Sequence, residues 1–391
     1  MNTFDNGQVR LDILRRRAFN YRWATLPEDV IPLTAADPDF PVAEAIREAI
    51  VTYVSEGNLC YGPAQGLPEF RDACAAFIET ERSIPSHPDL ILASDAAASA
   101  MRLVSRFALQ PGQEAIIFDP VDFLFRASVE AAGGVPIAYS MDNEENSFDA
   151  DRLAELVNEN TRMICLCNPH NPLGQVATPR MLEAIGEIAV RHNLWIMSDE
   201  VWSDIVYPPN RHHSIASISP EIAARTFSIY GFSKSYGIAG LRVGFISAPD
   251  TDTMKALTAL SRASDTMWGA STVSQIAAVA ALTRAGDWLR AFLQHLQGLR
   301  DLAVTRLNSM PGVYCDSPQA TFVLFPDVSS FGIRSEDIAK HLLETARVAV
   351  VPGSSEFFGP GAEGHIRLAF PTSEKILNEG LDRIQMGLSH L

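Results

Sequence analysis

The chain has 391 residues, of which 47% are hydrophobic and 20% are charged, and these proportions are typical of a globular protein. Its formal net charge of −16 argues against nonspecific binding to DNA or to anionic membranes. No apolar run approaches the roughly 20 residues that cross a bilayer, and the N-terminus lacks a signal segment, so the cytoplasm is the expected location.

Between about residues 90 and 250, strand-like apolar segments alternate with helical ones. The expected strands are residues 90–93, 114–118, 162–167, 194–198, 226–230 and 243–248. The expected helices are residues 97–107, 123–132, 151–158 and 179–192. This alternation predicts an α/β fold, a large domain with a mainly parallel sheet covered by helices on both faces.

A second pattern follows a helical stretch around residues 270–308. Short strands are expected at residues 312–314, 321–325, 348–351 and 365–369, with helices at residues 335–345 and 374–388. These elements predict a smaller C-terminal α+β domain. We therefore divide the chain into an N-terminal segment (1–45) that packs on the small domain, a large domain (46–275) and the small C-terminal domain (276–391).

Five scattered cysteines form no C-x-x-C pair, so we expect neither a bound metal nor a disulfide framework. Cys165 and Cys167 alternate within an apolar strand, where cysteine behaves as a small apolar residue. The adjacent His212 and His213 lie in a polar loop, which predicts a solvated turn.

Polar residues follow three of the expected strands: the turn at residues 168–174, Asp199 and Lys234. Because ligands of parallel sheets bind beyond the carboxyl ends of the strands, we expect these residues to meet at one edge. Asp199 ends an almost wholly apolar strand, where a carboxylate must be paired or solvated. Its alternative role is a helix N-cap, and the turn at residues 168–174 is alternatively a plain strand-to-helix loop.

Lys234 lies in Phe232-Ser233-Lys234-Ser235, a short turn straight after an apolar strand. A lysine held near fixed polar groups and away from water has a lowered pKa and becomes a nucleophile toward aldehydes. Eight residues later, Arg242 lies between two glycines in Gly240-Leu241-Arg242-Val243-Gly244, a setting that suits a phosphate. Together these residues point to a phosphorylated aldehyde bound to Lys234, which is pyridoxal 5′-phosphate (PLP).

Three further side chains match the same cofactor and its substrate. Asp199 suits a pyridinium nitrogen, which a carboxylate keeps protonated. An amide N–H of Asn171 can donate to the phenolate oxygen of the cofactor. Arg367 lies inside an apolar strand, where it is either one half of a salt bridge or a two-pronged donor for a substrate carboxylate.

These motifs resemble those of the fold-type I PLP enzymes, specifically the class I/II aminotransferase family, over nearly the whole chain. The resemblance is carried by Asp37-Pro38-Asp39-Phe40, Tyr61-Gly62 with Gly66-Leu67-Pro68, Asn171-Pro172-Leu173-Gly174, Asp199-Glu200-Val201, Ser233-Lys234, Gly240-Leu241-Arg242-Val243-Gly244, Val351-Pro352-Gly353 and Ile366-Arg367-Leu368. In the order given, they resemble the N-terminal substrate loop, the dimer-contact tyrosine segment, the NPTG turn, the cofactor aspartate, the Schiff-base lysine, the phosphate arginine and the C-terminal carboxylate-binding pair.

The resemblance implies that Lys234 holds PLP as an internal aldimine and moves the proton between Cα and C4′. It also implies that Asp199 pairs with the pyridine nitrogen, that Asn171 binds the 3′-oxygen and the substrate, and that Arg367 takes the substrate α-carboxylate. The phosphate contacts it implies are Ser233, Arg242, the backbone amides of Ala97 and Ala98 at a helix N-terminus, and Tyr61 of the other subunit of a homodimer. The substrate loop adds Ala36.

Several positions depart from the family pattern, among them the turn Ser94-Asp95-Ala96-Ala97-Ala98, where a glycine is common, and Gly231, where a phosphate-binding hydroxyl is often found. Two further departures concern the cofactor ring. Trp202 stands three residues after the aspartate, where a tyrosine is usual, and its indole can donate a hydrogen bond but has no phenol. Asp122 falls where a residue that stacks on the cofactor ring is expected, with Phe123 next to it. Either the loop shifts by one residue and Phe123 stacks, or the cofactor has no aromatic cover.

The reaction follows from what happens after the substrate loses its Cα proton to give a quinonoid. Reprotonation at C4′ gives transamination, whereas loss of a group from Cβ gives elimination. We expect an aminotransferase acting on an α-amino acid. The alternative is a β C–S lyase that cleaves cysteine S-conjugates or cystathionine, because residues 30–40 and 199–206 also resemble the cystathionine β-lyase-like branch. A DNA-binding regulator of the same fold is disfavoured, since few residues precede Asp37 and the chain is acidic.

Overall fold

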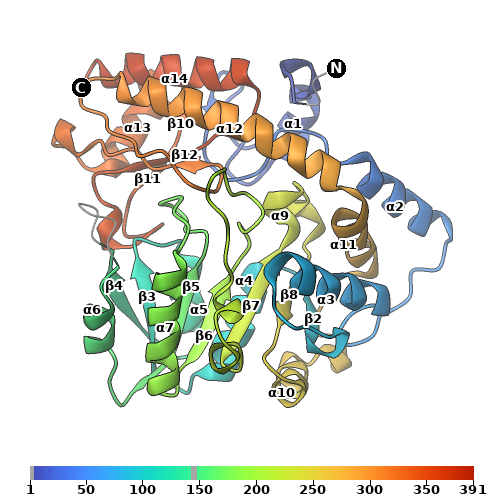
Figure 1. Cartoon of the computed structure of the whole chain (residues 1–391). Coiled ribbons are helices and arrows are strands. Elements are labelled where there is room, and N and C mark those ends of the chain that lie inside the picture. Colours follow the sequence, from blue (N-terminus) through green and yellow to red (C-terminus); the bar gives the residue numbers. More distant parts are fainter. Residues whose placement is uncertain (1–3, 142–147) are drawn as a thin grey trace.

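The computed structural model describes residues 4–141 and 148–391 and is built around a seven-stranded sheet (Figure 1). The strand order is β2-β8-β7-β6-β5-β3-β4. The strands are β2 (Ile91–Ser94), β3 (Glu114–Asp119), β4 (Val135–Ser140), β5 (Thr161–Cys167), β6 (Trp195–Asp199), β7 (Thr226–Gly231) and β8 (Gly244–Ser247). Neighbours from β4 to β7 are parallel, whereas β8 is antiparallel to both β7 and β2. The predicted α/β fold is confirmed.

The edge strand β4 was not predicted from the sequence. It carries Pro136, and most of its residues are partly or fully exposed. A proline lacks the N–H that a central strand needs, so it is tolerated at an edge. The sequence signal of a buried apolar strand is therefore absent from this segment.

Helices cover both faces of the sheet. On one face, Met163, Cys165 and Cys167 of β5 pack in a core with three helices, and on the other face Ile164 and Leu166 pack in a second core. The first group of helices is α4 (Ala97–Ala108), α5 (Leu124–Ala131) and α10 (Thr251–Ser261), and the second is α6 (Ala150–Glu155), α7 (Pro179–Arg191) and α8 (Pro220–Ala223). Because successive side chains of a strand point to opposite faces, an uninterrupted apolar strand fills both cores.

A third core lies beside the β2 edge of the sheet. Its helices are α2 (Glu44–Ser55), α3 (Pro68–Arg82) and α11 (Thr272–Arg284), and α11 packs against both of the others. The helical stretch predicted around residues 270–308 is two helices, since the chain breaks at Ala285 before α12 (Gly286–Asn308).

The C-terminal elements lie above the large sheet in Figure 1. A small antiparallel sheet has the order β11-β12-β9, and α12 packs against the last helix of the chain. These elements are β9 (Val323–Leu324), α13 (Ser335–Thr345), β11 (Val351–Pro352), β12 (Ile366–Ala369) and α14 (Glu374–Leu388). The strand predicted at residues 312–314 is wrong, because only Tyr314 makes an isolated bridge, to Asp327. Gly312 has a φ of 79°, which is typical of a turn.

The N-terminal segment contacts these C-terminal elements. It contains α1 (Leu11–Arg17) and β1 (Ile31–Pro32), and β1 pairs in parallel with β10 (Val348–Ala349). Phe4 is buried against Phe292 of α12, with ring centroids 5.1 to 5.5 Å from its aromatic neighbours. The domain boundaries at residues 45 and 275 stay predictions.

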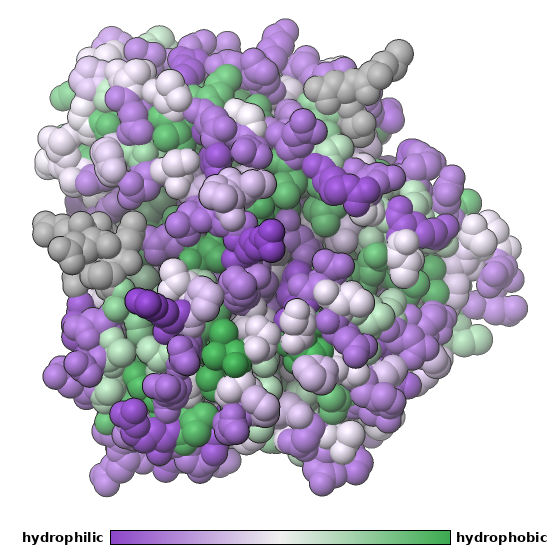
Figure 2. Space-filling view, viewed as in Figure 1, coloured by the Kyte–Doolittle hydropathy of each residue, from purple (hydrophilic) through white to green (hydrophobic). Residues whose placement is uncertain are grey.

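The face drawn in Figure 2 is mostly hydrophilic, with apolar residues in small separate patches. Among the described residues, no helix combines the length and the apolar character needed to cross a membrane.

Candidate active site

The carboxyl ends of β5, β6 and β7 open onto a cavity of about 400 Å³. In the sheet, Cys167 at the end of β5 lies opposite Asp199 at the end of β6. Asn171, Asp199 and Lys234, each predicted from a strand end, all line this cavity. The parallel register of the sheet therefore brings together three residues that are widely separated in sequence.

Lys234 lies in the one-turn helix α9 (Phe232–Ser235), which begins directly after β7. Its ε-amino group donates a hydrogen bond of 2.8 Å to the carbonyl oxygen of Ala36, and it lies 5.5 Å from the ring centroid of Trp202. Burial lowers the pKa of Lys234 from its ordinary value. Because burial disfavours the ammonium ion, more of this lysine is available as a nucleophilic amine.

Asp199 is the last residue of β6 and is buried. Its Oδ1 accepts a hydrogen bond of 3.1 Å from the backbone N–H of Val201, so it does take part in the local turn that its alternative role implies. Burial raises the pKa of Asp199 to about 7, and the negative charges of Asp122 and Glu200 add to this effect. A cation bound in the cavity would favour the ionised form of Asp199 over the protonated form, so the site suits a protonated ring nitrogen.

Arg367 enters the same cavity from β12 and is also buried. Its Nη1 donates to Oδ1 of Asn171 at 3.3 Å, and its Nη2 donates to the carbonyl oxygen of Thr34 at 3.2 Å. Burial lowers the pKa of Arg367. No carboxylate among the described residues lies within ion-pair distance of it, so the alternative of a salt bridge finds no partner there. A buried guanidinium without a counter-ion suits a carboxylate ligand.

The opposite end of the cavity is lined by Ser233, Arg242, Ala97 and Ala98. Helix α4 begins at Ala97 without a side-chain cap, so its first N–H groups face the cavity without a side-chain acceptor. A helix N-terminus beside a hydroxyl and a guanidinium is a setting that binds a phosphate. Gly231 permits this packing, because a Cβ there would lie 2.8 Å from a methyl group of Val201.

The predicted cofactor-binding residues Trp202, Phe123 and Tyr61 differ in how far they are exposed to solvent. Trp202 is buried and meets the ring of Phe322 edge-on, with a centroid distance of 4.7 Å. Phe123 lines the cavity but is 44% exposed. Tyr61 is 91% exposed and lines a separate surface hollow with Met267 and Trp268. Within one chain, Tyr61 is therefore not part of the cavity.

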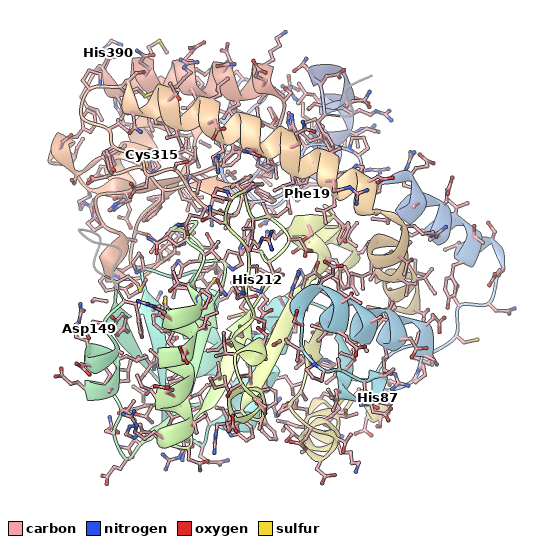
Figure 3. The ribbon with its side chains drawn as sticks, in the orientation of Figure 1. Phe19, His87, Asp149, His212, Cys315 and His390 are labelled. Atoms are coloured by element: carbon pink, nitrogen blue, oxygen red, sulfur yellow. The ribbon has the colours of Figure 1, made fainter. Side chains whose placement is uncertain are left out.

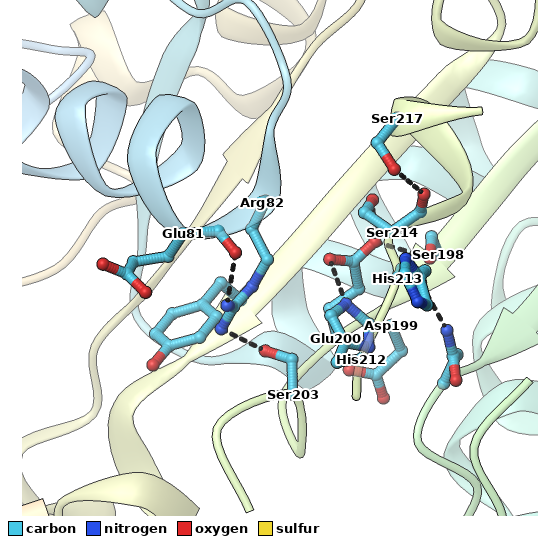
Figure 4. Close-up of polar contacts among 12 residues, drawn as sticks. Glu81, Arg82, Ser198, Asp199, Glu200, Ser203, His212, His213, Ser214 and Ser217 are labelled. Atoms are coloured by element: carbon cyan, nitrogen blue, oxygen red, sulfur yellow. Dashed lines mark hydrogen bonds and ion pairs between the residues drawn. The ribbon is translucent and has the colours of Figure 1, made fainter. Parts of the chain in front are cut away.

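A buried polar network supports the end of β6 (Figure 4). Glu200 accepts hydrogen bonds from Ser198 at 3.0 Å and from Ser214 at 2.5 Å, and it pairs with Nε2 of His212 at 3.2 Å. The side chain of His212 is 4% exposed, so the prediction of a solvated turn is wrong for this residue. Figure 3 shows it near the middle of the molecule, whereas His87 and His390 lie at the periphery.

Sequence reasoning missed this network because two of the partners of Glu200, His212 and Ser214, lie 12 and 14 residues further along the chain. The signal available in the sequence was a second acidic residue, Glu200, directly after the apolar strand, because a carboxylate buried there needs partners. On the other side of the same segment, Arg82 of α3 pairs with Asp204 and donates to Ser203 at 2.8 Å. The segment that follows Asp199 is therefore tied to two other parts of the chain.

Together these groups fit PLP: an amine with a lowered pKa, a buried carboxyl group that a cation would ionise, and an anion site at a helix N-terminus. Arg367 lines the same cavity and is not one of these groups, so it is available for an anion other than the phosphate. The fit comes from the described residues of this chain alone.

Comparisons with known proteins agree with this chemistry. Residues 28–384 match the family model "Aminotransferase class I and II". The chain is 31% identical over 369 residues to the aspartate aminotransferase of Pyrococcus horikoshii, covering 93% of this chain and 92% of that protein.

Solved structures show the same similarity. The aromatic aminotransferase from Pyrococcus horikoshii OT3 superposes with a TM-score of 0.87 at 32% identity, covering 93% of this chain and 97% of that one. A PLP-bound putative aminotransferase from Clostridium difficile 630 gives a TM-score of 0.89 at 25% identity, covering 96% of this chain and 97% of the other. These relatives are aminotransferases, so they support the first of the two expected reactions rather than the C–S lyase alternative.

Proposed function

We propose that this chain, which belongs to the aminotransferase class I and II family, prefers a substrate with an aromatic or apolar side chain. Its activity is that of a PLP-dependent aminotransferase of an amino acid. The observation that carries this proposal is the charge of the cavity wall. Its described cations are Lys234, Arg242 and Arg367. Each of the three has a role in binding the cofactor or the substrate α-carboxylate.

Lys234 moves the substrate proton. PLP supplies an electron-withdrawing ring that makes the Cα proton of a bound amino acid acidic. The Nζ atom of Lys234 accepts that proton and returns it, and burial supports this role because it lowers the pKa of the amine. The hydrogen bond to Ala36 supports a fixed position of Nζ at the cavity edge.

Asp199 holds the ring nitrogen in its protonated form. Burial raises the pKa of the Asp199 carboxyl to about 7, so a pyridinium beside it would favour the ionised carboxylate. The hydrogen bond from Val201 orients the carboxyl toward the cavity. At the other end, Ser233, Arg242 and the first N–H groups of α4 bind the phosphate.

Arg367 binds the substrate α-carboxylate, assisted by Asn171. Its Nε atom has no hydrogen-bond partner among residues 4–141 and 148–391, which supports a free donor for a ligand. Two planar N–H donors of a guanidinium match the two oxygens of a carboxylate.

The remaining wall of the cavity favours a neutral side chain. The described carboxylates there are Asp37, Asp95, Asp122 and Asp199, and the described aromatic residues are Tyr21, Phe123, Phe125, Trp202, Phe357 and Phe358. A second substrate carboxylate would find negative charge and no unassigned cation from this chain. An aromatic or apolar side chain would bury apolar surface instead.

We propose further that the protein is a homodimer in which Tyr61 reaches the phosphate bound by the other subunit. The exposure of Tyr61 supports this, because its ring and the aliphatic side chains of its neighbours Leu59 and Met267 are left without cover in one chain. A partner subunit would bury these side chains.

The test is a panel of amino acids incubated with the PLP-loaded protein and a panel of 2-oxo acids. We expect transfer that requires a 2-oxo acid acceptor, with kcat/KM at least ten-fold higher for phenylalanine than for aspartate. A preference for aspartate would contradict the substrate proposal. Release of pyruvate and thiol from S-alkyl cysteines without an acceptor would instead indicate C–S lyase activity.

A further inference from the structure

Asp122 is a carboxylate in the cavity wall that has no assigned part in binding the cofactor or the substrate α-carboxylate. It lies between β3 and α5, beside Asn171. Its Oδ1 accepts a hydrogen bond of 3.1 Å from the backbone N–H of Leu124, which is a local turn at the start of α5. That turn occupies only one oxygen, so it does not account for the second.

The second oxygen joins Asp122 to Asn171. Oδ2 of Asp122 accepts a hydrogen bond of 3.0 Å from Nδ2 of Asn171, and the backbone N–H of Asp122 donates to the carbonyl oxygen of Asn171 at 3.2 Å. A carboxylate can only accept hydrogen bonds. This contact therefore fixes the Asn171 amide with its Nδ2 toward Asp122 and its Oδ1 away from it.

The fixed amide in turn holds Arg367. Oδ1 of Asn171 accepts from Nη1 of Arg367, and a reversed amide would place N–H groups against the guanidinium, donor against donor. Charge acts in the same direction, because the field of Asp122 favours the charged form of Arg367 against the effect of burial. The three side chains form one chain of hydrogen bonds that ends at Arg367.

We propose that Asp122 is a positioning residue that acts through Asn171 to hold Arg367 in the orientation that receives the substrate α-carboxylate. This inference rests on the proposed roles of Asn171 and Arg367. The position is the one at which the sequence resemblance places a ring-stacking residue. An aromatic ring there could stack on the cofactor but could not accept these two hydrogen bonds.

Two variants separate the contacts of Asp122. Asp122→Ser keeps a side-chain oxygen that can accept from Leu124 but is too short to reach Asn171. Asp122→Asn keeps the size, but its amide cannot accept with both ends, so it must lose one contact or reverse Asn171. Asp250→Asn is the matched control, because Asp250 accepts from backbone N–H groups at the start of α10 and does not line the cavity.

The measurement is the dissociation constant of 3-phenylpropionate for the PLP-loaded protein, determined by isothermal titration calorimetry. This probe has the α-carboxylate and an aromatic side chain but no amino group, so it reports carboxylate binding without turnover. We expect both Asp122 variants to weaken binding about ten-fold, the loss typical of a buried hydrogen bond, with PLP still bound in full. With phenylalanine as substrate, KM should rise more than kcat falls. The control should bind the probe as the wild type does.

A double-mutant cycle with Arg367→Ala separates the inference from its premise. If Asp122 acts through Arg367, adding Asp122→Asn or Asp122→Ser to Arg367→Ala causes no further loss of affinity. Additive losses, or wild-type affinity in both Asp122 variants, would overturn the positioning role while leaving Arg367 in place. If Arg367→Ala alone leaves the affinity unchanged, the assignment of Arg367 itself fails. If Asp122→Asn does not fold, Asp122→Ser carries the same test.

Discussion

The ε-amino group of Lys234 donates a hydrogen bond of 2.8 Å to the carbonyl oxygen of Ala36, which lies 198 positions earlier in the chain. Ala36 follows β1, and β1 pairs with β10 of the C-terminal elements. Lys234, in α9 directly after β7, thus contacts the N-terminal segment, and this segment pairs with the C-terminal elements. Ala36 and Lys234 both line the cavity, and burial lowers the pKa of Lys234 there.

Replacing Lys234 with alanine should abolish transamination and the yellow absorbance of lysine-bound PLP. The physical reason is that no other described lysine lines the cavity, so no second amine can bond to the aldehyde. The control is Lys255→Ala, since Lys255 is exposed on α10 and pairs with Asp252. The measurement is the absorbance spectrum of each purified variant after PLP is added, and an unchanged chromophore in Lys234→Ala would refute the assignment.

Without PLP, the contribution of Asp199 to the free energy of unfolding should fall as the pH rises from about 4 to about 7. The folded-state pKa of Asp199 is about 7, above the ordinary value of 3.8, so the folded form binds more protons than the unfolded form in this range. A bound pyridinium pairs with the carboxylate, so the stabilisation by PLP should grow as the pH rises. Thermal unfolding with and without PLP at pH 5 and pH 8 measures this difference.

The variant Asp199→Asn is the check on that pH dependence, because an amide does not titrate. It should bind PLP more weakly, and the part of the pH dependence due to this residue should disappear. If the difference in Tm between the PLP-bound and PLP-free forms changes with pH as much in Asp199→Asn as in the wild type, another group is responsible.

Replacing Tyr61 with phenylalanine should raise the dissociation constant of PLP about ten-fold if its hydroxyl donates to the phosphate held by a partner subunit. Tyr314→Phe is the control, because Tyr314 is also exposed and its hydroxyl donates to nearby Asp316. Size-exclusion chromatography with light scattering gives the oligomeric state.

Mixed dimers give the sharper form of this test. A dimer of one Lys234→Ala subunit and one Tyr61→Phe subunit would contain one site with both wild-type residues, since each site would draw Lys234 and Tyr61 from different chains. PLP affinity should return to the wild-type value in that one site. Absence of any such site in the mixed dimer would argue that Tyr61 acts within its own chain, whereas wild-type PLP affinity in the Tyr61→Phe homodimer would show that it has no role.

Gly174→Ala should destabilise the protein by about 1–3 kcal/mol. Gly174 has a φ of 67°, and a Cβ there would overlap the side chain of Pro318. It closes the turn that carries Asn171, and its carbonyl oxygen accepts from the N–H of Ala320. The measurement is the free energy of unfolding in urea.

Gly298→Ala is the matched control, and it should raise the free energy of unfolding where Gly174→Ala lowers it. Gly298 is exposed in the middle of α12, and a Cβ there would meet no atom within 4 Å. Alanine is the better helix former, so this change should stabilise the protein by about 0.5–1 kcal/mol. A loss of stability at Gly298, or none at Gly174, would contradict the steric account.

Much of the large sheet could be predicted from the sequence because its signals are local. The strand around residues 162–167 has an uninterrupted apolar run that fills a core on each face, and the helices at residues 335–345 and 374–388 have the spacing of an amphipathic helix. The strand β4 lacked this signal because Pro136 and its exposed neighbours belong to an edge. The roles of the individual site residues and the domain boundaries stay predictions.

The sequence by itself determined which residues stand at the ends of strands, the cofactor from Lys234 and Arg242, and the family from motifs along nearly the whole chain. Only the tertiary structure decided that Asp122, Asn171 and Arg367 form one chain of hydrogen bonds, that His212 is buried against Glu200, and that Ala36 contacts Lys234. The physical reason is range: strand and helix patterns arise from neighbours along the chain, whereas these contacts depend on how distant loops are placed by the packing of whole elements.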